Sequence, residues 1–162
     1  MASGNTLAVL YPRDSSPPAT SYATLDTRNT HFVLDFDDTT GEAALFTFVL
    51  PRHYAGGGIT VYVGSSATSA TTGTVGWTVE FERIGTAQDT DADSFAGAQT
   101  ITAATVSGTS GVLIVTNVAV TDGANIDSIA VGELCRIRIT RDVANDTTVG
   151  DAELHFVELK ET

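Results

Sequence analysis

The acidic segment from Asp89 to Ser94 comes closest to a metal site in residue types and spacing. Asp89, Asp91 and Asp93 alternate with other residues, and converging carboxylates of this kind can bind a hard cation such as calcium. In a helix-loop-helix calcium loop, however, the sixth position is glycine and the twelfth is a bidentate glutamate. Those positions hold Ser94 and Thr100 here, so the pattern favours a solvated acidic loop.

A second acidic cluster comprises Asp35, Asp37 and Asp38. Asp35 and Asp37 share one face of an expected strand, where they could bind a cation, pair with Arg28 or serve a hydrolase as clustered acids. Glycoside hydrolysis needs two carboxyl groups about 5 to 10 Å apart in a cleft. Because the chain has 20 Asp and Glu residues, the presence of acids carries little information, and a plain surface face is favoured.

The histidines and nucleophiles form no local catalytic motif. His31, His53 and His155 lie far apart, so a zinc site would require several of them to converge from different strands. A Ser-His-Asp triad stays open because its members need not be neighbours, but Gly-x-Ser-x-Gly is absent. Strand parity buries Cys135, and Gly56-Gly57-Gly58 lacks the Lys-Ser/Thr of a phosphate loop. We therefore predict no catalytic, cofactor-binding or metal-binding residue, and a protein that is not an enzyme.

Aromatic residues could form a sugar-binding platform, as they do in β-sandwich carbohydrate modules. Trp77 shares its parity with Val75 and Val79, so core packing is favoured for it. Tyr62 has the opposite parity from its apolar neighbours, which predicts an exposed ring, and Tyr54 is a further candidate.

Strands must position all of these residues. The run 75–82 alternates strictly, with Val75, Trp77, Val79 and Phe81 on one face, which is the signature of a strand with one buried face. We expect further strands at residues 7–11, 22–25, 32–37, 42–50, 95–106, 112–120, 135–140 and 152–159, and one that begins at residue 59. A hairpin turn at 109–111, a one- or two-turn helix within 122–132 capped by Asp122, and a bulge between Phe156 and Val157 complete the expectation.

These elements predict an all-β fold: a two-sheet antiparallel sandwich of jelly-roll type with one short helix. Residues 1–21 would form an N-terminal arm and residues 22–162 a single β-sandwich domain. Strand 42–50 is apolar on both parities, so a second layer or a partner chain should cover it. The candidates for subunit contact are Leu7, Val9, Leu10, Tyr11, Leu45 and Val49.

Bulk composition excludes several functions. Eight Lys and Arg against 20 Asp and Glu give a net charge of −12, which argues against binding nucleic acid or an anionic membrane surface. No apolar run is long enough for a transmembrane helix, and the first residues do not resemble a signal peptide. A single cysteine cannot form an internal disulfide, so stability must come from packing or assembly.

Five segments together resemble a family of small structural proteins of tailed bacteriophages and prophages. They are Tyr22-Ala23-Thr24-Leu25-Asp26-Thr27-Arg28-Asn29, Leu34-Asp35-Phe36-Asp37, Leu50-Pro51-Arg52-His53-Tyr54-Ala55-Gly56-Gly57-Gly58, Asp91-Ala92-Asp93-Ser94-Phe95 and Gly150-Asp151-Ala152-Glu153-Leu154. The resemblance implies a virion component with a jelly-roll-like domain, on the particle surface and assembled in the host cytoplasm. It carries no catalytic residue over.

Three functional hypotheses follow. The first is a non-enzymatic virion protein, a capsid decoration (cement) protein that binds the major capsid protein or another virion protein as a homotrimer. The alternative is a carbohydrate-binding β-sandwich module of a tail or head fibre that takes part in host recognition. The third is a hydrolase that uses acids such as Asp35 and Asp37.

Overall fold

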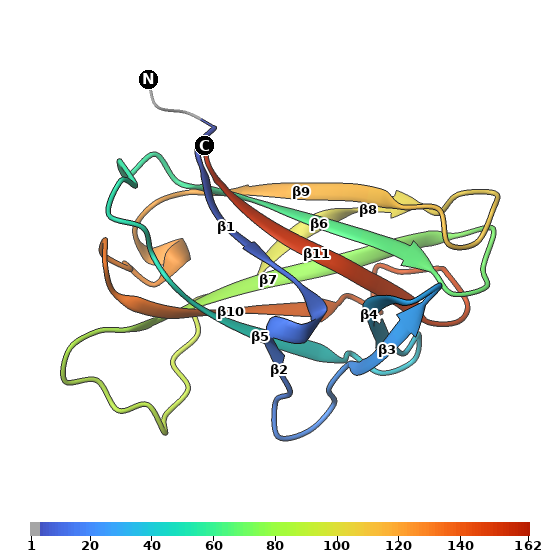
Figure 1. The fold of residues 1–162 in the computed structure, drawn as a ribbon, viewed down its shortest axis with the longest axis horizontal. Helices are drawn as coiled ribbons and strands as arrows, with labels where there is room; N and C mark the ends of the chain where they lie inside the picture. The colour runs from blue at the N-terminus through green and yellow to red at the C-terminus, as the bar shows by residue number, and fades with distance from the viewer. Residues whose placement is uncertain (1–3) are drawn as a thin grey trace.

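The protein folds as two antiparallel β-sheets packed face to face (Figure 1). The structure is a computed structural model and describes residues 4–162. The strands in chain order are β1 (Thr6–Leu10), β2 (Ser15–Ser16), β3 (Thr24–Arg28), β4 (His31–Phe36), β5 (Ala43–Val49), β6 (Ile59–Ala67), β7 (Thr74–Ile84), β8 (Gln99–Thr105), β9 (Ile114–Val120), β10 (Leu134–Arg141) and β11 (Ala152–Glu161). Two single-turn 3-10 helices, η1 (Pro12–Asp14) and η2 (Ala124–Ile126), interrupt them.

The strand order is that of a jelly roll. One sheet has six strands in the order β3-β4-β11-β6-β9 with β1 also paired to β11, and the other has five in the order β2-β5-β10-β7-β8. From β4 to β11 the chain changes sheet at every connection except β7 to β8. The predicted fold class is therefore confirmed.

Apolar alternation builds the core between the sheets. The inward residues of β7 and β10, among them Trp77, Phe81 and Ile137, have no solvent exposure. Phe36 of the opposite sheet meets Trp77 edge to face, with ring centroids 4.9 Å apart. Such a pair contributes about 0.5–1.5 kcal/mol beyond the area it buries. The predicted inward parity of Trp77 and Cys135 is confirmed.

The glycine triplet forms a sharp corner before β6, as expected. Gly56 and Gly58 have positive φ angles of 85° and 95°. A Cβ atom on Gly58 would lie 2.7 Å from the carbonyl oxygen of Val120, so only glycine fits there.

Three local predictions are wrong. Residues 109–111 do not close a hairpin, because β8 and β9 belong to different sheets and the chain crosses between them. The bulge in β11 falls at His155, since the register with β6 shifts between Leu154 and Phe156. Asp122 does not cap a helix: its carboxylate accepts a hydrogen bond from the Tyr54 hydroxyl at 2.7 Å, and the residue before η2 is Gly123.

The first described segment belongs to the sheet of its own chain. β1 pairs with the end of β11, while β4 pairs with the beginning of β11 on the same side. Residues 1–3 of the predicted arm lie outside the described residues, and the division at residue 21 stays a prediction.

The six candidates for subunit contact divide into two groups. The core of this chain already buries Leu7, Leu10 and Leu45, so their side chains are not free for a partner. Val9, Tyr11 and Val49 are exposed. Contact with another subunit through these three stays a prediction.

Candidate functional site

The short helix η1 is locked by its own sequence. Pro12 presets the backbone at the first helical position and is buried. The backbone N–H of Tyr11 donates to the Asp14 carboxylate at 2.8 Å, and the Asp14 N–H donates back to the Tyr11 carbonyl at 2.8 Å. The Ser15 hydroxyl donates to the Pro12 carbonyl at 2.7 Å. This closed turn fixes the directions of Tyr11 and Arg13.

A tight hairpin brings β4 beside η1. Asn29 and Thr30 both have positive φ angles, 45° and 68°, in the two-residue connection between β3 and β4. Turns of this kind match the twist of paired strands. They set Arg28 opposite His31 and Thr27 opposite Phe32.

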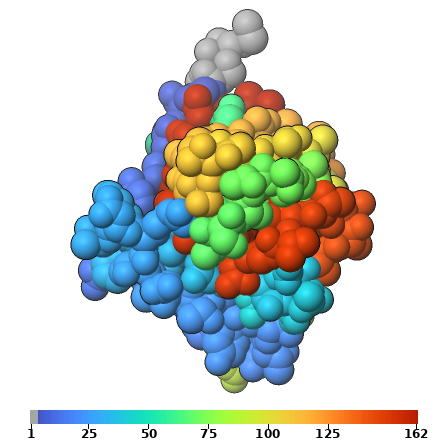
Figure 2. Space-filling model, turned by 90° about the vertical axis from the view of Figure 1, so that its right-hand side faces the viewer, coloured from blue at the N-terminus to red at the C-terminus, as the bar shows by residue number. Residues whose placement is uncertain are grey.

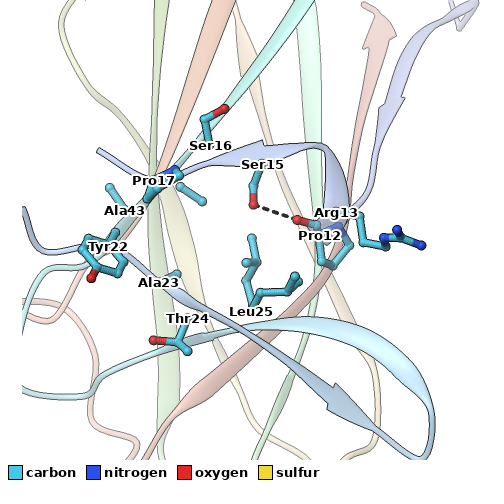
Figure 3. Close-up of a pocket in the computed structure, with 12 residues that line it drawn as sticks. Pro12, Arg13, Ser15, Ser16, Pro17, Tyr22, Ala23, Thr24, Leu25 and Ala43 are labelled. Atoms are coloured by element: carbon cyan, nitrogen blue, oxygen red, sulfur yellow. Dashed lines mark hydrogen bonds between the residues drawn. The ribbon is translucent and has the colours of Figure 1, made fainter. Parts of the chain in front are cut away.

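Two hollows adjoin η1. The first, here called the Phe32 hollow, has a volume of about 360 Å³ and is lined by Tyr11, Pro12, Arg13, His31, Phe32 and His155. The second, the Tyr22 hollow, has about 300 Å³, and its walls include Pro17, Tyr22, Ala23 and Leu25 (Figure 3). Pro12 and Arg13 border both. In Figure 3 the Arg13 guanidinium points away from the Tyr22 hollow. Both volumes lie at the lower end of the range for small-molecule sites, about 300–1,000 Å³.

All exposed aromatic side chains of residues 4–162 border these hollows. Tyr11 is 56% exposed, Tyr22 50% and Phe32 42%. Tyr11 and Phe32 line one hollow and Tyr22 lines the other. The remaining aromatic rings are buried or half-buried. The apolar ring faces that this chain leaves open to solvent are therefore gathered at one place.

Two kinds of polar group stand beside the rings. The Arg13 guanidinium lies over Phe32, with its central carbon 4.9 Å from the ring centroid. His155 is half-buried, and its Nε2 lies 2.9 Å from the Ser66 hydroxyl. That hydroxyl donates its proton to Glu153 at 2.8 Å, so Nε2 of a neutral His155 must carry the N–H. Nδ1 is then left as an acceptor.

Ser66, His155 and Glu153 meet, but in the wrong order for a hydrolytic triad. In a triad the histidine accepts the serine proton and the acid orients the histidine. Here the carboxylate of Glu153 takes the serine proton directly and also accepts from Arg28 at 2.8 and 3.0 Å. Ser66 is 1% exposed, so no substrate carbonyl reaches it. The arrangement ties β11 to β6 and β3.

The carboxyl group of Asp35 lies where its negative charge is unfavourable. It sits opposite Glu153 in the register of β4 and β11, and its Oδ1 is buried without a hydrogen-bond partner in the described residues. Burial, followed by the charges of Glu153, Asp26 and Asp151, raises the pKa of Asp35 to about 6. Asp35 does not pair with Arg28, whose guanidinium contacts Glu153 instead.

Asp37 and Asp38 stabilise turns and do not combine with Asp35. Asp37 accepts hydrogen bonds from the Thr39 backbone, the Thr39 hydroxyl and the Thr40 backbone at 2.6 to 2.8 Å, and these bonds lower its pKa. Asp38 accepts from the Gly150 N–H at 2.5 Å. The carboxylate oxygens of Asp37 and Asp38 that accept these bonds therefore stabilise the protein's own turns.

A third hollow, here called the Glu80 hollow, lies on the outer face of the five-stranded sheet. It has about 440 Å³, and its walls include Thr20, Glu80, Asp93, Arg138 and Thr140. Both oxygens of Glu80 accept from Arg138, at 2.6 and 2.7 Å. The Arg138 guanidinium also lies 4.2 Å above the Phe95 ring.

The other aromatic candidates from the sequence do not form a platform. Tyr54 is buried. Its hydroxyl donates to Asp122 and accepts from the Gly58 N–H at 3.0 Å. The ring of Tyr62 is half-buried, with Lys160 above it at 5.9 Å, and it borders none of the three hollows. Trp77 is in the core, as predicted.

The candidate metal and thiol residues are accounted for by other contacts. Asp93 pairs with Arg136 at 2.6 Å, and Asp89 accepts the Asp91 N–H at 2.9 Å. No three His, Cys, Asp or Glu side chains within residues 4–162 are placed to hold a metal ion. Burial raises the pKa of the Cys135 thiol to about 12, so it is not a nucleophile at neutral pH. Among the same residues, no helix has the length and apolarity needed to cross a membrane.

Sequence reasoning missed the Phe32 hollow because its members come from separate segments. Tyr11 and Arg13 flank a proline, His31 and Phe32 follow a turn, and His155 is the bulged residue of the last strand. The useful signal would have been aromatic residues next to turns and prolines, since Phe32, at the beginning of β4, is exposed although it has the same parity as the buried Leu34.

Comparison with known proteins gives a fold and no family. The sequence matches no protein family and no curated protein. Among solved structures, the CBM22-2 xylan-binding domain of Paenibacillus barcinonensis Xyn10C is similar, with 14% identity, a TM-score of 0.51, and coverage of 96% of this chain and 99% of that one.

Two more solved structures show weaker likeness. The carbohydrate-binding module CBM6cm-2 of Cellvibrio mixtus lichenase 5A, solved with cellotriose, has 13% identity, a TM-score of 0.48, and coverage of 98% and 99%. The CBM22-1 xylan-binding domain of Paenibacillus barcinonensis Xyn10C has 11% identity, a TM-score of 0.45, and coverage of 99% and 96%. At these identities the likeness concerns the β-sandwich fold alone.

Proposed function

We propose that the chain is a non-catalytic carbohydrate-binding β-sandwich module and that the Phe32 and Tyr22 hollows hold the saccharide. One observation carries the proposal: Tyr11, Tyr22 and Phe32, the exposed aromatic rings of the described residues, all border two adjoining hollows. Exposed apolar side chains scattered singly need no explanation, whereas rings gathered around a concavity indicate a binding site.

The chemistry of the site suits a sugar ring. A pyranose presents C–H groups on its faces and hydroxyls around its rim. The negatively polarised face of an aromatic ring attracts those C–H groups. The hydroxyls need directional partners, and Arg13, His31 and His155 supply donors and acceptors in the Phe32 hollow.

The likeness of fold supports this reading. The xylan-binding domain that resembles this chain is covered almost completely, so the shared part is the whole sandwich. The same scaffold therefore carries carbohydrate binding in at least that protein. The absence of an ordered nucleophile, base and acid around Ser66 is consistent with binding without turnover.

The test is a glycan array followed by calorimetric titration of the best saccharide. We expect Tyr11→Ala and Tyr22→Ala each to weaken binding by about tenfold, because a stacked ring contributes about 1–1.5 kcal/mol. Leu113→Ala is the matched control, since Leu113 is 48% exposed and borders none of the three hollows. Binding that is absent across the array, or equal in all three variants, would contradict the proposal.

The virion role remains a second candidate, and one surface favours it. Val112 and Leu113, just before β9, and Val115 within it are exposed, and β9 is an edge strand of its sheet. An exposed apolar edge can pair with another chain. Light scattering at tens of micromolar tests the predicted homotrimer. A monomer that does not bind phage particles would contradict the decoration role while leaving the carbohydrate proposal intact.

A further inference from the structure

Among residues 4–162, no Asp or Glu lines the Phe32 hollow. This is unusual for a chain that has 20 Asp and Glu residues against eight Lys and Arg. Its charged or ionisable residues are Arg13, His31 and His155, together with the Tyr11 phenol. The adjoining Tyr22 hollow also lacks Asp and Glu in its walls. Two carboxylates that are neighbours in sequence of the lining residues are occupied: Asp14 accepts the Tyr11 N–H, and Glu153 accepts from Arg28 and Ser66.

Arg13 is a cation without an anion in the described part of the chain. Within residues 4–162, the other arginines apart from Arg52 form ion pairs with Asp or Glu at 4.0 Å or less. Arg13 forms no such pair and makes no hydrogen bond within those residues; its one described interaction is the stacking on Phe32. The central carbon of the guanidinium lies over that ring, and the N–H groups of Arg13 donate to no other residue in the described part of the chain. A guanidinium edge fits a carboxylate with two parallel hydrogen bonds.

The hollow therefore combines an aromatic face, a free guanidinium edge and a histidine acceptor. The face suits a sugar ring, the edge suits a carboxylate, and Nδ1 of neutral His155 can accept a sugar hydroxyl proton. A neutral saccharide would leave the charge of Arg13 unused. An anion without a ring would leave Tyr11 and Phe32 unused.

We propose that the saccharide bound in the Phe32 hollow is acidic, of the uronic-acid or sialic-acid class, with its carboxylate on Arg13 and its ring against Phe32. This inference rests on the proposed carbohydrate-binding function and adds the ligand class and the residue that selects it. Arg13 is then the specificity-determining residue, and the aromatic rings supply affinity common to acidic and neutral sugars.

The experiment compares matched pairs of ligands by calorimetric titration of the full chain. One pair is trigalacturonic acid and its methyl ester, and the other is sialyllactose and its methyl ester. We expect at least one acidic member to bind about tenfold to a hundredfold more tightly than its neutral counterpart, the range for a hydrogen bond to a charged group. Arg13→Gln should remove that difference, because the affinity of the acidic member falls to that of its neutral counterpart.

Arg52→Gln is the control variant. Arg52 lies in the exposed turn after β5 and, like Arg13, forms no ion pair within the described residues, but it borders none of the three hollows. We expect it to bind both members of each pair as the unchanged chain does. Thermal unfolding of both variants checks that neither change alters the fold.

The possible outcomes separate the two proposals. Equal binding of acidic and neutral members, with Tyr11→Ala weakening both, would overturn the acidic ligand and keep the carbohydrate function. A preference for the acid that survives Arg13→Gln would overturn the role of Arg13. If no acidic or neutral saccharide binds, both proposals fail.

Discussion

The Phe32 hollow and the Glu80 hollow differ in whether their polar groups are already used. In the Glu80 hollow, Arg138 and Glu80 satisfy each other with two hydrogen bonds, and Asp93 pairs with Arg136. In the Phe32 hollow, Arg13 has no anion among the described residues, and His155 keeps one ring nitrogen free. The Glu80 hollow is the larger of the two, yet fewer of its charged groups are free to bind a ligand. Volume alone does not identify a binding site, because a ligand must find unpaired groups.

The difference has a structural origin. The charges of the Glu80 hollow stand on neighbouring strands in register, with Arg138 opposite Glu80 and Arg136 opposite Glu82. Cross-strand neighbours of opposite charge meet without any further folding. Arg13 stands on a short helix outside the sheet, so no strand brings it a partner. Figure 2 views the molecule from one end, where atoms from distant parts of the chain, coloured blue, green, yellow and orange, lie side by side.

The largest expected effect comes from breaking the ion pairs of the five-stranded sheet. Glu82 is 1% exposed, and its partners are Arg136 and the Ser94 N–H. Arg136→Met leaves that carboxylate buried without its cation, which costs about 3–5 kcal/mol. Urea unfolding of the variant should show the loss at neutral pH. A loss below about 1 kcal/mol would mean that water already compensates the Glu82 charge.

The next effect concerns the ring in the Phe32 hollow. Phe32→Leu keeps an apolar side chain but removes the aromatic ring over which the Arg13 guanidinium lies. We expect saccharide affinity to fall by about tenfold, while the unfolding free energy changes by less than about 1 kcal/mol, because Phe32 lies outside the hydrophobic core. Titration and unfolding of the same sample separate the two quantities. A large loss of stability with unchanged affinity would show that Phe32 is structural.

A pH-dependent effect is expected at Asp35, on the strand that carries Phe32. Its folded pKa of about 6 lies above the ordinary value of 3.8, so ionisation is less favourable in the folded state. The stability contributed by the protonated form is complete below about pH 4 and is lost as pH rises through 6. After discounting for solvent screening, Asp35→Asn should stabilise the protein by about 1 kcal/mol at pH 7.5.

The same variant provides its own control. Near pH 4 the carboxyl is protonated in the folded chain, so Asp35→Asn and the unchanged protein should unfold at nearly the same urea concentration. A stability difference that does not vary with pH would show that the pKa of Asp35 is the same in the folded and the unfolded chain.

The smallest effect is expected in the Glu80 hollow. Thr20 and Thr140 line it, and their side chains make no hydrogen bond within the described residues. Thr20→Ala and Thr140→Ala should change saccharide affinity by less than twofold, because the ligand is expected in the other hollows. A tenfold loss in either variant would move the proposed site to this face of the sheet.

Part of the molecule could be predicted because period-two alternation specifies a buried face directly. Val75, Trp77, Val79 and Phe81 are all in the core, as their spacing indicated. Glu82 shows the limit of the same rule. Its parity points outward, yet the loop after β7 covers it and Ser94 and Arg136 enclose it. Parity gives the side of the sheet and does not say what lies on that side.

The sequence by itself determined that apolar residues at alternate positions would pack two β-sheets face to face, since each strand carries that information in a few consecutive side chains. Only the tertiary structure decided that Tyr11, Phe32 and His155 meet. Tyr11 follows β1, Phe32 lies in β4 and His155 forms the bulge of β11, and long-range strand pairing sets their distances. Local patterns encode burial, whereas a binding site depends on contacts between distant segments.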